Sequence, residues 1–301
     1  MRLRSTVALI AVTGAVLAGV SCGNILTASE TSAIAAPVSV QSALPRIGGL
    51  SGIEVVAGGD QFIGLSDRGF LVFGRLIRQN GRLTEAHVDS RLDFPAPDGS
   101  TDPMGAGDSE GLARDKDGRL RISLEQNNAV WRIEDDGLTT QLPDPPETGQ
   151  LIANGKYEAL AVDDSGALYT LPETVIEKRR FVPLWRLDGE AWSKVRDVPL
   201  IDNFHPVGAD FGPDGAFYLL ERAFGLGFSN QIRRFDLSDP SDPGRVIWRT
   251  DEHLRANFEG LSVWQDATGR TMLTMVSDDN FLPLLESAIL EISLDSLGPS
   301  R

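Results

Sequence analysis

Acidic residues recur at the same place in a repeated sequence pattern, and their types and spacing point to chemistry. Each copy runs from a short apolar stretch through a glycine turn to a second apolar stretch that ends near an acidic residue. In two copies a glutamate stands at both ends, as Glu110 with Glu125 and Glu158 with Glu173. Carboxylates gathered in this way bind divalent cations or act as general acids and bases.

Cross-strand pairing predicts where these side chains meet. If each copy forms an antiparallel hairpin centred on its turn, the residues at its two ends lie side by side. The pairs predicted in this way are Ser51 with Asp67, Glu110 with Glu125, Glu158 with Glu173, Val207 with Arg222 and Glu259 with Asp278. Asp210 and Glu221 stand close to the fourth pair. About seven carboxylates would then crowd one site.

Such crowding requires compensation, because two carboxylates a few Å apart do not both stay ionised. Arg68 and Arg222 can form bidentate pairs, and backbone N–H groups can serve other carboxylates. A bound divalent cation is the third way to compensate the carboxylate charge. A ligand set of oxygen donors favours Ca²⁺, with Mg²⁺ as the alternative. The metal-binding set that we predict is Asp67, Glu110, Glu125, Glu158, Glu173, Glu221, Glu259 and Asp278. The alternative is that these glutamates only tie neighbouring blades of the fold together through hydrogen bonds. His205 stands nearby as a general base or a packed residue.

The spacing of the copies predicts the elements that position these groups. The copies begin at Ser51, Glu110, Glu158, Val207 and Glu259, at intervals of 48 to 59 residues. A four-stranded propeller blade has a repeat of about 40–50 residues. We therefore expect an all-β protein, a β-propeller with five blades by this count and six as the alternative. The first strands would line the central channel, and all the pairs would then surround one mouth of that channel.

Short apolar stretches predict the individual strands. Those of the third copy are Ala159–Val162, Ala167–Leu171, Phe181–Leu187 and Trp192–Val198. The fifth copy has three strands before the chain ends, so we expect Pro37–Ile47 to close the last blade and remove its exposed edge. Small residues in each first strand fit the tight axis, namely Gly52, Gly111, Ala159, Gly208 and Gly260. Leu112, Leu160 and Leu261 would fill the gaps between blades.

The N-terminus has the pattern of an export signal. Arg2 and Arg4 precede an apolar run, Val7–Val20, which is short for a membrane span. We divide the chain into a signal peptide (1–21), a flexible linker (22–44) and a propeller domain (45–301). A small residue before Cys22 suggests lipidation of that cysteine, and cleavage after Ala35 is the alternative. The protein would be periplasmic or lipid-anchored to the bacterial envelope, with no other membrane contact.

Composition excludes several function classes. Asp and Glu number 43 against 28 Lys and Arg, for a formal net charge of −15. Phosphate backbones repel such a surface, so we expect no nucleic acid partner. One cysteine excludes an internal disulfide and a cysteine-based zinc site.

The ordered motifs resemble a known family. The motifs are GGLSGIEV with SDRG, then SEGLARDKDGRLRISLEQN, GKYEALAVDDSGALYTLPE, LLERA, and NFEGLSV with SDDN. Together they resemble the phytase-like, "esterase-like activity of phytase" family over nearly all of residues 45–295. The family is bacterial and largely exported. The resemblance implies hydrolysis of phosphate esters or other esters by the carboxylates named above.

Two functions follow as hypotheses. The first is a monomeric, metal-dependent hydrolase of a small-molecule ester or phosphoester. The residues that we expect to act on its substrate are Glu110, Glu158, Glu259, Arg68 and Arg222. The second is a non-catalytic binding or scaffold propeller of the envelope, since propellers host both classes.

Overall fold

The structure is a computed structural model that describes residues 36–100, 108–125, 128–146, 157–173, 180–225, 227–250, 256–282 and 285–298. The predicted signal peptide, Cys22 and its lipidation lie outside the described residues. Within these ranges no helix is long and apolar enough to cross a membrane.

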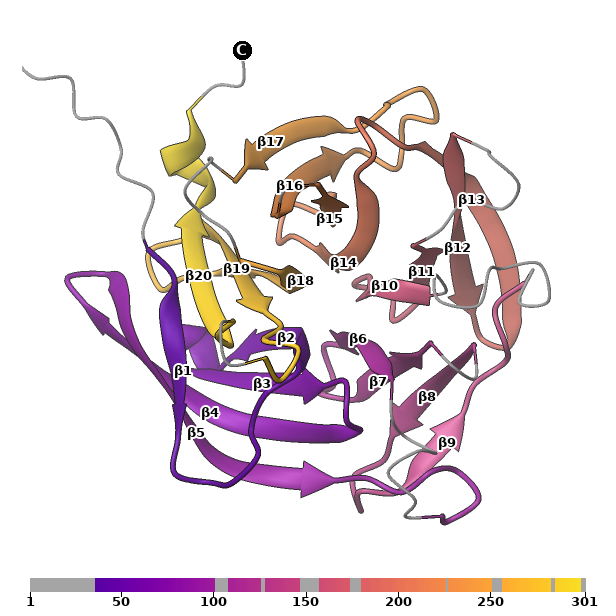
Figure 1. Cartoon of the computed structure of the whole chain (residues 1–301). Coiled ribbons are helices and arrows are strands. Elements are labelled where there is room, and N and C mark those ends of the chain that lie inside the picture. Colours follow the sequence, from indigo (N-terminus) through magenta and orange to yellow (C-terminus); the bar gives the residue numbers. More distant parts are fainter. Residues whose placement is uncertain are drawn as a thin grey trace, which may run out of the picture. The chain divides into compact units, whose positions relative to one another are not determined.

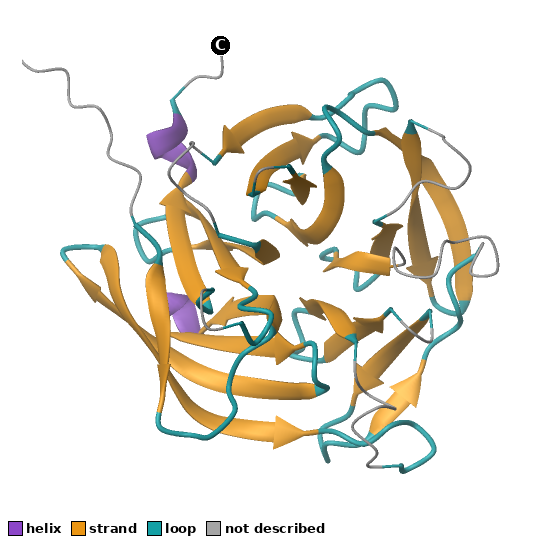
Figure 2. Ribbon diagram, in the orientation of Figure 1, coloured by secondary structure: helices purple, strands orange, loops and turns teal. Residues whose placement is uncertain are grey.

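Strands dominate the described residues and fall into sets of four along the chain (Figure 2). The first set is β2 (Leu50–Val56), β3 (Gln61–Ser66), β4 (Phe70–Gln79) and β5 (Arg82–Asp93). The second is β6 (Ser109–Arg114), β7 (Leu120–Leu124), β8 (Ala129–Ile133) and β9 (Thr139–Gln141). The third is β10 (Tyr157–Val162), β11 (Leu168–Pro172), β12 (Phe181–Asp188) and β13 (Ala191–Pro199). The fourth is β14 (His205–Phe211), β15 (Phe217–Phe224), β16 (Phe228–Phe235) and β17 (Arg245–Arg249). The fifth is β18 (Phe258–Gln265), β19 (Thr271–Ser277) and β20 (Ala288–Ser293), completed by β1 (Val38–Ser42). Two short 3₁₀ helices, η1 (Ala57–Gly59) and η4 (Leu294–Leu297), accompany these strands.

The sets are arranged around a central axis, as Figure 1 shows. The first strand of each set, the inner strands β2, β6, β10, β14 and β18, stands nearest the axis, and each contacts the next around the ring. Sets two to four form separate four-stranded sheets, whereas sets five and one share an eight-stranded sheet. The expected all-β propeller is therefore confirmed. Its number of blades stays the prediction from the repeat count.

The strand β1 joins the two ends of the ring. Val38 pairs antiparallel with Ile289 of β20, so the N-terminal strand closes the last set as expected. Val40 also pairs with Ala86 of β5, in parallel. This second pairing was not foreseen and produces the eight-stranded sheet. Since β1 lies in the stretch 22–44 that the sequence assigned to a linker, the folded part begins no later than Val38.

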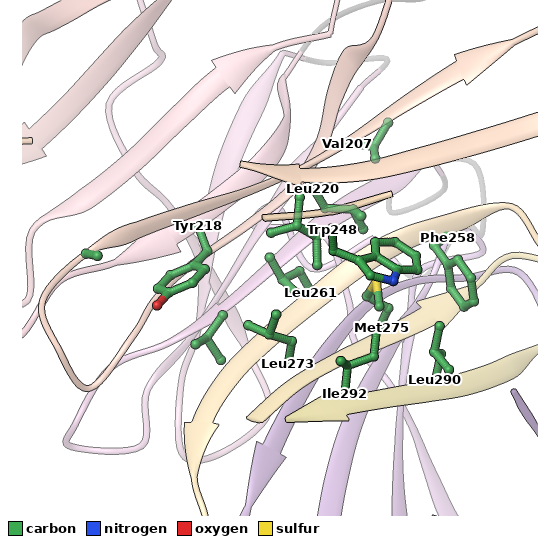
Figure 3. Packing of buried hydrophobic residues seen from close by; sticks show 13 residues of the cluster. Val207, Tyr218, Leu220, Trp248, Phe258, Leu261, Leu273, Met275, Leu290 and Ile292 are labelled. Atoms are coloured by element: carbon green, nitrogen blue, oxygen red, sulfur yellow. The ribbon is translucent and has the colours of Figure 1, made fainter. Parts of the chain in front are cut away.

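The core consists of apolar layers between neighbouring sets. One layer joins the fourth and fifth sets and includes Leu220, Phe258, Leu261 and Leu273, all almost fully buried (Figure 3). Leu112 lies in an equivalent layer, so these leucines fill inter-blade gaps as predicted. Burying one leucine side chain contributes about 1.5–3 kcal/mol.

The axis itself is closely packed. A Cβ added to Gly111 would lie 2.3 Å from the carbonyl oxygen of Glu158, and one on Gly208 would lie 2.3 Å from that of Glu259. These contacts explain the small residues at the start of the inner strands. The space left on the axis between the inner strands is about 10 Å³, room for about one water molecule. A ligand would therefore bind at the mouth rather than pass along the axis.

Candidate functional site

A β-bulge occurs near the start of every inner strand. In β10, Tyr157 lies opposite Pro172 and Ala159 opposite Leu171, which leaves Glu158 as the extra residue. The equivalent irregularities lie at Ser51, at Glu110 with Gly111, at Val207 and at Glu259. A bulge bends the strand and redirects its side chain. The acidic positions of the repeats thus coincide with the places where the ladder is interrupted.

The bulges make the predicted cross-strand pairs wrong in register. Arg222 lies opposite His205 rather than Val207. The backbone N–H of Glu125 donates to the carbonyl of Asp108, at 2.8 Å, rather than facing Glu110. The backbone N–H of Asp67 donates to Gly49 and that of Asp278 to Asn257, instead of Ser51 and Glu259.

The mouth carboxylates nevertheless lie close enough to disturb one another. Burial, together with the charge of Asp278, raises the pKa of Asp67 to about 7. Burial likewise raises the pKa of Glu259 to about 7, against the lowering effect of Arg222. Burial first and Glu173 second raise the pKa of Glu158. These carboxyls come from the first, third and fifth sets, so the mouth brings together residues far apart in the sequence.

Arg222 lies among three of these glutamates. Its Nη2 is 3.1 Å from Glu173 Oε1 and 3.8 Å from Glu158 Oε2, and its Nη1 pairs with Glu259. Nη1 also donates to Asn257 Oδ1 at 3.0 Å. Burial opposes the charge of Arg222, but the three carboxylates outweigh burial and raise its pKa. Arg222 is therefore committed to protein carboxylates, which leaves it little capacity to bind an anionic substrate.

A second cluster of carboxylates belongs to the second set. Carboxylate oxygens of Asp108, Glu110 and Glu125 lie within 4.8 Å of one another, and all three side chains are half-buried. Among the described residues no hydrogen bond or ion pair reaches the Glu110 carboxylate. Burial, then Glu158 and Glu259, raise the pKa of Glu110. Asp108 was not predicted as a site residue, although an acidic residue two positions before Glu110 is visible in the sequence.

Glu221 lies apart from the glutamates around Arg222 and from the Asp108–Glu110–Glu125 cluster. Its two oxygens accept from Arg233 Nε at 2.8 Å and Arg233 Nη2 at 2.6 Å, and Gln231 Nε2 donates at 2.8 Å. Both Glu221 and Arg233 are fully buried. Neighbouring residues in a strand point to opposite faces of the sheet. Arg222 is therefore on the face that borders the mouth, and Glu221 is on the opposite, buried face of β15.

Arg68 carries an exposed guanidinium at the mouth. Its side chain is 64 % exposed, and its Nε is 3.6 Å from Asp67 Oδ1. The guanidinium carbon lies 4.5 Å from the ring centroid of Phe281. The Nδ1 atom of His205, at the start of β14, lies 2.9 Å from the backbone carbonyl oxygen of Glu173. Arg68 thus remains open to solvent, whereas Arg222 does not.

Residues 107–111, GDSEG, have the G-x-S-x-G spacing of a serine nucleophile. In the structure Ser109 is buried on β6, and its hydroxyl donates to the carbonyl of Ser66 at 2.7 Å. A nucleophile elbow instead exposes its serine between a strand and a helix. Ser109 therefore serves packing between the first and second sets.

Through Arg222 of the fourth set, Glu173 of the third set and Glu259 of the fifth do tie neighbouring sets together, and two other carboxylates tie inner strands directly. Glu54 Oε1 accepts from the backbone N–H of Arg114 at 2.9 Å. Asp210 Oδ2 accepts from that of Val263 at 2.6 Å. Each of these carboxylates lies three residues after a bulge and ties one inner strand to the next.

The sequence model of the family described as "Phytase-like: Esterase-like activity of phytase" matches residues 45–281. The chain belongs to this family. No curated protein matches it.

Three solved structures that are similar to this phytase-like chain have low sequence identity to it. One is a catalytically inactive virginiamycin B lyase from Staphylococcus aureus with quinupristin, at 15% identity, covering 83% of this chain and 72% of that one, with a TM-score of 0.40. Another is the Cps50 (Swd1) β-propeller domain of Myceliophteria thermophila, at 9% identity, 82% and 98% coverage and a TM-score of 0.43. A third is a luciferin-regenerating enzyme, at 10% identity, 85% and 95% coverage and a TM-score of 0.44.

The mouth of this phytase-like propeller thus holds two groups of carboxylates. In the first group, Arg222 neutralises Glu158, Glu173 and Glu259. In the second group, the oxygens of Asp108, Glu110 and Glu125 converge. Convergent oxygen donors suit a hard divalent cation.

Proposed function

We propose that this phytase-like propeller is a metal-dependent ester hydrolase that works at the acidic mouth. The observation that carries the proposal is the convergence of Asp108, Glu110 and Glu125 within 4.8 Å. Membership of a family described by esterase-like activity supports the same reaction class.

The donor set fits Ca²⁺, with Mg²⁺ as the alternative, because it consists of oxygens only. Asp108, Glu110 and Glu125 would hold the ion, and Glu221 is left out because it binds Arg233. When bound, a divalent ion polarises the ester oxygen and stabilises the charge that develops there.

Other residues of the mouth would accept the proton of the attacking water and position the residue that accepts it. Glu158 is close enough to Glu110 to raise its pKa, yet lies outside the ligand set. We assign to its carboxylate the role of accepting a proton from the attacking water. Arg222 contacts Glu158 and would position it.

The substrate class follows from the charges. Among the residues that the structure describes, a phosphate monoester entering this mouth would meet several carboxylates and one exposed guanidinium, Arg68. Such a field repels anions. We therefore favour carboxylic esters over phosphate esters. We further propose that the protein acts in the periplasm or anchored to the envelope, because Arg2, Arg4 and the run Val7–Val20 have the form of an export signal.

Calcium titration of matched variants tests the site. Glu110→Gln removes one ligand charge, so we expect Ca²⁺ affinity to fall at least tenfold in isothermal calorimetry. Glu221→Gln is the control, because this glutamate lies away from the mouth, and its affinity should equal that of the parent. Hydrolysis of a panel of carboxylic and phosphate esters, with Ca²⁺ and with chelator, tests the reaction. Unchanged Ca²⁺ affinity in Glu110→Gln would refute the site.

A non-catalytic binding propeller is the second candidate. The observation in its favour is Arg222, since a ring of acids satisfied by a guanidinium needs no substrate. In that case Ca²⁺ would raise the thermal stability of the protein, and no ester in the panel would be hydrolysed with or without the ion.

A further inference from the structure

A buried asparagine contacts the guanidinium of Arg222. Asn257 directly precedes β18 and is 2 % exposed. Its Oδ1 accepts from Arg222 Nη1 at 3.0 Å, and its Nδ2 donates to Glu259 Oε1 at 2.8 Å. Glu259 itself pairs with Arg222 Nη1. The three side chains therefore form a closed triangle, in which each contacts the other two.

The surroundings of Asn257 fix the orientation of its amide. Its backbone carbonyl oxygen accepts from the backbone N–H of Asp278, just after β19, at 2.9 Å. The side-chain oxygen faces a guanidinium and the side-chain nitrogen faces a carboxylate. The reversed amide would place donor against donor and oxygen against oxygen, so its charged partners determine which way it points.

The triangle in turn fixes the plane of the Arg222 guanidinium. A guanidinium is planar, so directing the Nη1 hydrogens at Asn257 and Glu259 also determines where the Nη2 hydrogens point. Nη2 lies 3.1 Å from Glu173 Oε1 and 3.8 Å from Glu158 Oε2. The contact with Glu158 is longer than a hydrogen bond and depends on how the guanidinium is turned.

An asparagine suits this place because its side chain carries no charge. An aspartate at position 257 would set a second carboxylate against Glu259 Oε1, which lies 2.8 Å from the amide nitrogen. A lysine or arginine would compete with Arg222 for the same carboxylate. The amide links the guanidinium and the carboxylate and leaves the charge of the mouth unchanged.

We propose that Asn257 is a positioning residue, which holds the Arg222 guanidinium in the orientation that reaches Glu158. This inference rests on the proposed ester hydrolase, in which Glu158 accepts the proton of the attacking water. Asn257 acts through Arg222 rather than on the ester. A turned guanidinium would leave the Glu158 carboxylate without this contact, so the chemical step would slow while binding of the ester stays the same.

Two variants of buried asparagines test the proposal. Asn257→Leu keeps roughly the volume of the side chain and removes both of its hydrogen bonds. With 4-nitrophenyl butyrate as the ester and Ca²⁺ present, we expect kcat to fall about tenfold or more, with KM and Ca²⁺ affinity close to those of the parent. Should Asn257→Leu fail to fold, Asn257→Ser, which has one polar side-chain atom in place of two, replaces it.

The matched control is Asn230→Leu. Asn230 is also fully buried, but its amide donates to the backbone carbonyl of Phe258 at 2.8 Å and not to the mouth. Both variants lose a buried hydrogen bond and should lower the Tm. Only Asn257→Leu should lower kcat.

Nuclear magnetic resonance measures the hold on Arg222 without any reaction. A guanidinium held at both Nη groups should give separate ¹⁵N signals for Nη1 and Nη2 in the parent, and the loss of these signals in Arg222→Met identifies them. Rotation of the freed guanidinium should average the two signals in Asn257→Leu. They should stay separate in Asn230→Leu.

The outcomes separate this inference from the hydrolase itself. An equal kcat in Asn257→Leu and Asn230→Leu, or a fall in Ca²⁺ affinity that accompanies the fall in kcat, overturns the positioning role while the hydrolase stands. If the parent hydrolyses no ester, the hydrolase fails and the Arg222 signals decide. Averaged signals in Asn257→Leu alone support the hold of Asn257 on Arg222, and unchanged signals overturn it.

Discussion

Replacing Arg222 with methionine tests whether this guanidinium compensates the acidic mouth. The substitution keeps the length of the apolar stem and removes the charge that pairs with Glu173 at 3.1 Å and with Glu259. The carboxylates then repel one another without a fixed counter-charge. We expect Arg222→Met to lose stability and to bind Ca²⁺ more tightly than the parent.

The size of the loss follows from burial and geometry. Removing one partner of a buried ion pair costs about 3–5 kcal/mol. The low end applies here, because the Arg222 side chain is 18 % exposed and Glu259, with a pKa of about 7, can take up a proton. A loss of about 3 kcal/mol corresponds to a fall in Tm of roughly 6–12 °C for a domain of this size. We expect Ca²⁺ affinity to rise about fivefold, which is roughly 1 kcal/mol.

Differential scanning calorimetry and Ca²⁺ titration, each with and without chelator, measure both effects. The matched control is Arg233→Met, which removes an arginine from an equally close pair with Glu221, away from the mouth. This control should lose about 3–5 kcal/mol and keep the Ca²⁺ affinity of the parent. An unchanged Tm in Arg222→Met, or equal shifts of Ca²⁺ affinity in both variants, would refute the reasoning.

Three further predictions concern the scaffold. Gly111→Ala should destabilise the fold by about 1–3 kcal/mol in urea denaturation, because its Cβ would lie 2.3 Å from a backbone oxygen, whereas Gly225→Ala, which has open space, should not. Burial raises the pKa of Asp210 to about 7, so its contribution to stability is full below about pH 4 and is lost as the pH rises through 7. That loss approaches about 4 kcal/mol as an upper bound. Between pH 5 and 8 the Tm of Asp210→Asn should fall less steeply with pH than the Tm of the parent. Equal slopes of Tm against pH would contradict this prediction. Deletion of residues 37–47 exposes an edge of β20 and an edge of β5 together, so size-exclusion chromatography should show aggregation, and a monomer with the parent Tm would contradict the closure.

Much of the architecture could be predicted from local patterns. Strand period and turn glycines depend on short stretches of chain, so the repeats predicted the propeller and the closing strand before any contact was known. Gly111 and Leu112 were correctly interpreted as packing residues, because a converging axis and an inter-blade gap recur in every copy. Even the inward turn of Glu221 was within reach, since alternation along a strand sends it and Arg222 to opposite faces.

The tertiary structure alone decided how the acidic residues meet. The bulge at Glu158 has no local signature, and the equivalent bulge beside Gly111 lies where the neighbouring inner strand approaches within contact distance. The extra residue of each bulge shifts the register between the first two strands of a set, so the residues of each predicted pair do not lie directly opposite each other. Which glutamates Arg222 neutralises depends on the placement of side chains from different sets. Such contacts arise between residues far apart in the chain, where neither periodicity nor spacing carries information.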